Sequence, residues 1–478
     1  MEVCIFFAII FFIGTYLLYR SKNERHFIIF LIRTKHFLNI INRLSRLSPR
    51  FWNFMGDLSI FISFSGLGAA YLSKYRRLNK NLSIILLLFG IIMIMLYSSG
   101  ILLVIMLILL AIGVVSLDKI KSPVADFITS AVIMSAISLK MARLEMAILE
   151  GIFGLLVFII TPLVLHAIDI SYGKTSLPGV SPILPGSEQG RIGFVVPGMN
   201  IFIPLGYGLV AIILLVIIHE SSHGILARSN NINLKSTGLL TLGIIPIGAF
   251  VEPDEEEFRK SEGIRRMRVL AVGSISNLIT AILSLFMFAF LILPSQCLIV
   301  EKSNSEIPPG TEVIAMTNKS IINYISATMA NYIFTENLYN LSEFVGNGTL
   351  VLKTDDREFV LNSEELKGML FSYKPRFRFE LDIFGINVFS IIAGILFWTY
   401  FFNLNVGLVN LLPIVPFDGG KMTSELISSL NINKSVINVF TYAIILVCLI
   451  VILINALPLL DMIIEFISRM NYSIVLPI

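Results

Sequence analysis

The stretch Val216–Leu226 reads VIIHESSHGIL and places two histidines and a glutamate inside an apolar run. In a helix, His219 and His223 lie one turn apart on the same face, where two imidazoles can bind one zinc ion. Glu220 lies beside them and can take a proton from a zinc-bound water. Ionisable side chains in an apolar helix of this kind usually serve a function. We therefore interpret the HESSH segment as part of a catalytic zinc site.

The composition around this segment is that of a membrane protein. Of the 478 residues, 56% are hydrophobic and only 14% are charged, and the mean hydropathy is +0.85. An ordinary soluble domain carries about 25% charged residues. The net charge of +4 is small, so no nucleic-acid partner is expected. The three cysteines are too few and too scattered for a disulfide framework or a CxxC metal site.

The first 200 residues are expected to form N-terminal transmembrane helices and a basic cytoplasmic segment. Val3–Tyr19 is interpreted as a retained anchor, and the basic segment Arg20–Arg50 as cytoplasmic, with an amphipathic helix on the membrane surface. Further apolar runs follow, of which the first is a possible span and the second is one tilted helix or two short ones: Phe51–Tyr71, Leu82–Leu117, Ala125–Leu139 and Met146–Ile168. The segment Ser171–Gly198 is rich in Gly, Pro and Ser and is predicted to be a loop.

Residues 201–293 contain the HESSH helix and two further apolar elements. The run Ile201–Leu226 is long enough to span, and Val269–Leu293 is predicted to span in the opposite direction. Between them, Leu239–Pro253 is apolar but interrupted by glycines and a proline. We interpret it as a re-entrant element, which implies a cavity because irregular backbone at membrane depth needs polar partners.

The rest of the chain returns to the membrane after a polar interval. Residues 294–387 combine charges, turn signals and short β-branched runs such as TEVIAMTN, which predicts a small soluble α+β domain inserted between two membrane helices. Residues 388–478 contain a span at Val388–Leu412, a break at PIVPFDGG and a C-terminal helix at Val436–Leu457. The predicted fold is thus a polytopic α-helical membrane protein.

A zinc site with two histidines needs a third protein ligand and leaves the fourth position for water. Asp418, in the segment NLLPIVPFDGG, is the main candidate, since two prolines interrupt the helix and two glycines let the backbone approach a metal closely. Glu425 lies shortly after Asp418 and is the alternative third ligand.

Together, HESSH and NLLPIVPFDGG resemble the two motifs of the site-2 protease family of intramembrane zinc metalloproteases. The broken loop GIIPIGAFVEP and the segment Gly273–Asn277 also resemble parts of that family, and the resemblance covers about 216–445. It implies that His219, His223 and Asp418 bind zinc and that Glu220 is the general base. The loop, including Gly248, and the side chains of Asn277 and Asn410 would hold the substrate.

The resemblance further implies a PDZ-like domain at 294–387, of which Ile307–Ile321 resembles the turn, strand and loop. The resemblance implies transmembrane proteins as substrates. The composition predicts a multi-pass protein, expected in the cell membrane, and the Lys/Arg-containing segment that follows the HESSH helix, through Arg268, predicts an active site nearer the cytoplasmic face. The bilayer is its other partner. Asn277 could instead bond to a neighbouring helix. The alternative function is a metal transporter or channel in which the same ionisable residues line an ion path.

Overall fold

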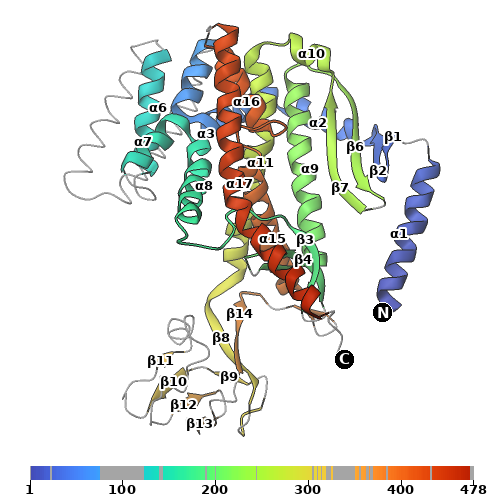
Figure 1. Cartoon of the computed structure of the whole chain (residues 1–478), viewed down its shortest axis with the longest axis vertical. Coiled ribbons are helices and arrows are strands. Elements are labelled where there is room, and N and C mark those ends of the chain that lie inside the picture. The colour runs from blue at the N-terminus through green and yellow to red at the C-terminus, as the bar shows by residue number, and fades with distance from the viewer. Residues whose placement is uncertain are drawn as a thin grey trace. The chain divides into compact units, whose positions relative to one another are not determined.

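The computed structural model describes residues 2–21, 24–75, 123–138, 144–188, 191–199, 201–243, 245–303, 386–430 and 433–473, with short segments between 306 and 383. The predicted run Leu82–Leu117 lies outside these residues. The chain divides into two compact units (Figure 1): the first comprises Met1–Ile282 and Trp398–Ile478, and the second comprises Leu283–Phe397.

Five helices within the described residues are long and apolar enough to cross a membrane. They are α3 (Pro49–Tyr75), α9 (Leu205–Ser229), α11 (Gly263–Leu291), α15 (Val388–Val409) and α17 (Lys434–Ser473), of which Ser435–Met462 is the apolar part. The apolar runs predicted to span around the HESSH motif and near the C-terminus, and the possible span at Phe51–Tyr71, are thus confirmed as helices of sufficient length. The protein is therefore a multi-pass membrane protein.

Shorter helices complete the first unit: α1 (Glu2–Arg20), α2 (His36–Leu47), α6 (Pro123–Ser138), α7 (Leu144–Phe153), α8 (Leu155–Ser171), α10 (Glu255–Lys260) and α16 (Asp418–Ser428). The apolar run Met146–Ile168 is divided between α7 and α8. The break lies at Gly154, whose φ of 67° is accessible to glycine but costly for other residues.

The predicted re-entrant element is a β-hairpin. Strands β6 (Leu234–Leu242) and β7 (Ile245–Pro253) pair antiparallel, and β1 (Glu24–His26) and β2 (Ile29–Thr34) extend the sheet in the order β1-β2-β6-β7. The prediction of irregular backbone in this segment was therefore wrong. The segment is regular because β2 supplies hydrogen-bond partners for the backbone of β6. Figure 1 shows the hairpin running alongside α9, and β7 forms the edge of the sheet nearest to it.

The predicted loop at Ser171–Gly198 is also partly wrong. Residues in its second half form β3 (Leu184–Glu188) and β4 (Arg191–Val196), which pair with β5 (Ile201–Pro204) in a three-stranded sheet. Val196 and Ile203 of this sheet are buried against Ala211 and Leu215 of α9. The sheet therefore supports the beginning of the helix that carries the HESSH motif.

Two apolar clusters hold α9 and α11 in place. In one, Ile41 of α2 is fully buried among Ile225, Leu226 and Val269. In the other, side chains of α3 such as Ile60 and Phe61 pack with Met267 and Ile275 of α11. The basic segment thus contains a helix, α2, as predicted, and Ile41 on it packs against α9. Its place on the membrane surface stays a prediction.

The second unit contains mainly short strands in its described part. They are β8 (Ile292–Lys302), β9 (Glu312–Val313), β10 (Ala315–Asn318), β11 (Ile325–Ser326), β12 (Leu350–Lys353), β13 (Glu358–Leu361), β14 (Leu370–Phe377), β15 (Asp382–Ile383) and β16 (Ile386–Asn387). They form sheets in the orders β11-β10-β12-β13, β14-β8-β9 and β15-β16. The predicted β-branched runs are therefore strands, while the PDZ-like assignment stays a prediction.

Candidate metal centre

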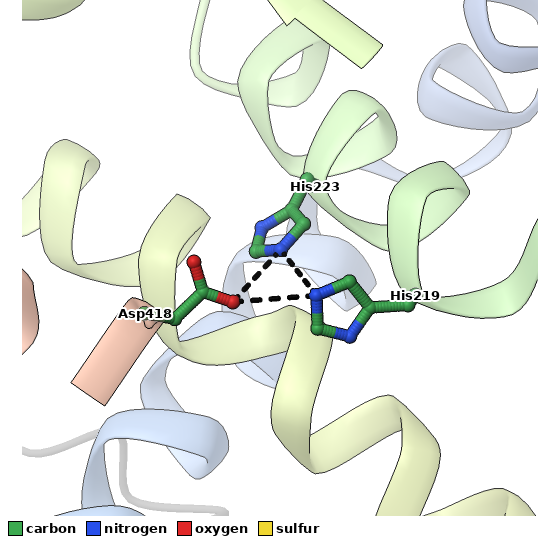
Figure 2. Close-up of side chains that lie close together, drawn as sticks. All are labelled: His219, His223 and Asp418. Carbon is green, nitrogen blue, oxygen red and sulfur yellow. Dashed lines mark hydrogen bonds and ion pairs between the residues drawn. The ribbon is translucent and has the colours of Figure 1, made fainter. Parts of the chain in front are cut away.

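Side chains from two distant segments meet in the first unit (Figure 2). His219 and His223, one turn apart on α9, direct their Nε2 atoms at each other across 3.1 Å. Asp418 Oδ2 lies 3.3 Å from Nε2 of His219 and 3.1 Å from Nε2 of His223. The structure thus brings together the three residues that the sequence singles out as zinc ligands.

A tight turn delivers Asp418 to the histidines. Asp418 begins α16, directly after the segment that interrupts the apolar helix α15. The two glycines that follow pack closely against the chain just before Asp418. A Cβ on Gly419 would lie 2.1 Å from the carbonyl oxygen of Leu411, and one on Gly420 would lie 2.5 Å from the carbonyl carbon of Ile414. The glycines therefore let α16 pack directly on the turn.

The three ligand atoms fit a divalent metal ion. Tetrahedral zinc with bonds of about 2.0–2.1 Å separates its ligand atoms by roughly 3.3 Å, close to the separations of 3.1–3.3 Å observed here. Asp418 is only 9% exposed, and its Oδ2 has no hydrogen-bond partner in the described part of the structure. A buried carboxylate oxygen without a donor is costly unless a cation meets it. Two imidazoles and one carboxylate are also a donor set that zinc prefers.

The outer nitrogens of both imidazoles face α11. Nδ1–H of His223 donates to the carbonyl oxygen of Val269 over 2.6 Å, which leaves the lone pair on Nε2. Nδ1 of His219 lies 3.2 Å from the side-chain amide nitrogen Nδ2 of Asn277. Between these two positions, Gly273 passes against both rings. Helix α11 is therefore the surface on which the two imidazoles rest.

Glu220 points toward β7. Its Oε2 accepts a hydrogen bond from the backbone N–H of Val251 over 3.0 Å. Both residues line a cavity of about 720 Å³ that also contains His219, His223 and Asp418. The carboxylate is thus held at the wall of the same cavity as the three candidate ligands, between α9 and the edge of the sheet.

The other candidate residues separate into three groups. Gly248 and Asn410 line the cavity, as expected of groups that contact a substrate. Asn277 is fully buried and contacts His219. Glu425 forms a two-point ion pair with Arg266, through bonds of 2.8 and 3.1 Å. This pair fixes α16 to α11 and leaves Glu425 outside the group of ligand atoms, against its alternative role as the third ligand.

Sequence reasoning missed the backbone partners of the site. The N–H of Val251 is a group that every residue type except proline carries, and the carbonyl of Val269 is one that every residue carries, so residue identity gives no signal for them. Gly273 did carry a signal, because a glycine in the interior of an apolar helix often has a packing reason. The reason here is the close approach of the two imidazoles.

Comparison with known proteins agrees with this geometry. Residues 207–455, about half of the chain, match the family model of peptidase family M50. The chain is also 29% identical over 245 residues to an uncharacterized protein of Methanocaldococcus jannaschii. That match covers 50% of this chain and 61% of the relative, so the chain spans less than two thirds of the relative's length. The range matched by the family model contains all but the first two residues of α9, the whole of α11, and Asp418. The chain therefore belongs to peptidase family M50, the site-2 protease family of membrane metalloproteases.

Proposed function

We propose that this chain is a zinc endopeptidase that hydrolyses peptide bonds within or near the transmembrane helices of other membrane proteins. The observation that carries the proposal is the convergence of His219, His223 and Asp418 on one point, with Glu220 on the wall of the same cavity. The three convergent residues would hold the zinc ion. When bound, zinc supplies a Lewis acid that polarises a carbonyl and makes water acidic enough to react near neutral pH.

Glu220 is the group that moves the proton. As a carboxylate, it accepts a proton from the attacking water and returns it to the leaving amine. The hydrogen bond from Val251 N–H occupies one oxygen and fixes the direction of the other. The apolar wall of the cavity, including Leu215 and Val216, limits the amount of water around it.

The free edge of β7 is suited to hold an extended substrate. In an antiparallel pair, alternate residues direct their N–H and C=O groups away from the partner strand. Val251 does so, because its N–H reaches Glu220, and Ala249, two residues earlier, therefore has the same orientation. Ala249 and Gly248 line the cavity, and Gly248 presents no side chain there. A transmembrane helix must unwind locally before its carbonyls can be attacked, and addition to β7 would keep the unwound segment extended.

We also propose which side of the membrane each part of the chain faces and what the second unit does. The basic segment Arg228–Arg268 favours a cytoplasmic location for this end of α9 and α11, in the cell membrane, with the second unit on the opposite side. The second unit, here proposed to be PDZ-like, would act as a size filter for substrates. Asn410, on the cavity wall, would contact the substrate strand.

The proposal can be tested with the purified full chain in liposomes. A model substrate with one transmembrane helix should be cut, a zinc chelator should stop the cleavage, and added zinc should restore it. A transporter would instead move metal ions across the vesicle membrane while leaving the substrate intact. Metal flux without cleavage would overturn the proposed function.

A further inference from the structure

We infer that Asn277 is a positioning residue, whose side-chain oxygen holds His219 in the tautomer that metal binding requires. The inference rests on the proposed metal centre. The two side chains are in contact, with 3.2 Å between the amide of Asn277 and Nδ1 of His219. Asn277 is fully buried and His219 is 8% exposed, so water does not replace this contact readily.

The geometry of His219 fixes where its proton lies. Its Nε2 lies 3.3 Å from Asp418 Oδ2 and 3.1 Å from Nε2 of His223, so Nε2 is the atom turned toward the metal position. A neutral imidazole that binds a metal through Nε2 carries its proton on Nδ1. This N–H is buried and needs an acceptor.

The side-chain oxygen of Asn277 is that acceptor. The oxygen and nitrogen of an amide have nearly the same shape, and their hydrogen-bond partners decide which one faces a neighbour. In the structure the amide nitrogen Nδ2 faces His219. Its N–H would require a lone pair on Nδ1, which moves the ring proton to Nε2, where it would point at the metal position. This orientation also leaves Oδ1 of Asn277 buried without a partner in the described structure. Exchanging the amide oxygen and nitrogen removes both conflicts, since Oδ1 then accepts the Nδ1–H of His219.

The two histidines are then oriented in the same way. His223 donates its Nδ1–H to the carbonyl of Val269. With the amide oxygen of Asn277 toward it, His219 donates its own Nδ1–H to a residue two turns further along α11. Both acceptors belong to one rigid helix, so α11 aligns both Nε2 lone pairs with Asp418. Partners of this kind typically contribute 10- to 100-fold to metal affinity. Because Asn277 is buried behind His219, this role replaces the substrate-holding role that the sequence suggests.

The test is the zinc affinity of the full chain, measured by competition with a chromogenic chelator. Asn277→Leu and Asn277→Ala both remove the acceptor, and they should bind zinc 10- to 100-fold more weakly than the wild type. Asn277→Asp keeps an acceptor oxygen and should stay within about threefold or bind more tightly. The Co²⁺-loaded forms provide a second readout, since the visible absorption spectrum should change in the Leu and Ala variants and be retained in the Asp variant.

Asn403 provides a matched control. It is also fully buried in a membrane helix, but its amide donates to the carbonyl of Thr399 in its own helix. Asn403→Leu should therefore leave the zinc affinity unchanged. Unchanged affinity in both Asn277→Leu and Asn277→Ala, or equal weakening in Asn277→Asp, would overturn the inference. Failure of the wild type to bind zinc would instead overturn the proposed function.

Discussion

Gly273 of α11 lies so close to His223 that a Cβ on the glycine would stand 2.3 Å from Nε2 of the imidazole. The same Cβ would stand 2.8 Å from Cε1 of His219. Both distances are far below an ordinary carbon contact of about 3.5–4.0 Å. The position of the two proposed zinc ligands therefore depends on the absence of a side chain at residue 273.

Gly273→Ala should displace both imidazoles and lower the zinc affinity by at least about tenfold, on the scale of other losses of ligand orientation. Zinc content after dialysis and chelator competition would measure the effect. Gly206→Ala is the control, because Gly206 lies on α9 and a Cβ there would meet nothing within 4 Å. Normal zinc affinity in Gly273→Ala would show that the rings do not need this space.

Matched amide substitutions separate the two candidates for the third ligand. Asp418→Asn should lose zinc, because it removes the charge of the proposed ligand. Glu425→Gln should keep zinc and lower the free energy of unfolding by about 1.5–3 kcal/mol, because it weakens the charged hydrogen bonds to Arg266. Metal analysis and chemical denaturation would measure the two effects. The opposite result, with zinc lost only from Glu425→Gln, would assign Glu425 as the ligand.

Ala249→Pro tests the edge of β7. Proline removes the N–H that faces the cavity but no hydrogen bond between β6 and β7, and edge strands tolerate it. The variant should bind zinc normally and show a KM for a transmembrane substrate raised by about tenfold or more, since strand addition depends on main-chain hydrogen bonds. Ala249→Ser keeps the N–H and serves as the control. An unchanged KM in the proline variant would exclude strand addition at this position.

Cysteine labelling tests the proposed sidedness. In a background without Cys4, Cys297 and Cys448, a cysteine at Lys302 in the second unit should react with a membrane-impermeant reagent from outside. A cysteine at Lys260, in the basic segment, should react only from the cytoplasmic side. Labelling of Lys302→Cys only from the cytoplasmic side would show that the topology is the reverse of the one proposed.

The parts of the site predicted from sequence are those that depend on local spacing. His219 and His223 lie on one face of a helix because four residues make about one turn. Asp418 could be identified because a carboxylate between prolines and glycines is unusual in an apolar segment. Its approach to the histidines, about two hundred residues earlier, confirms that the two segments form one site.

The β-structure could not be predicted in the same way, because strand pairing is set by partners distant in sequence. Leu239–Pro253 reads as a broken loop by its glycines and proline, yet β2 pairs with β6 from about two hundred residues away. The bulge between Leu240 and Thr241 further hides the alternation of the hairpin. The positioning role proposed for Asn277 could not be predicted from the sequence either. An asparagine in an apolar helix gives the same sequence pattern whether its amide faces a substrate, a neighbouring helix or a histidine.

The central claim is that the zinc ligands and the proton-transferring base are separate groups in one cavity. The most direct test is Glu220→Gln, assayed together for bound zinc and for cleavage of a transmembrane substrate in liposomes. We expect about one zinc per chain, as in the wild type, and at least a hundredfold slower cleavage, because the base is lost while the ligands remain. Cleavage at the wild-type rate by the zinc-loaded Glu220→Gln protein would show that Glu220 is not the base.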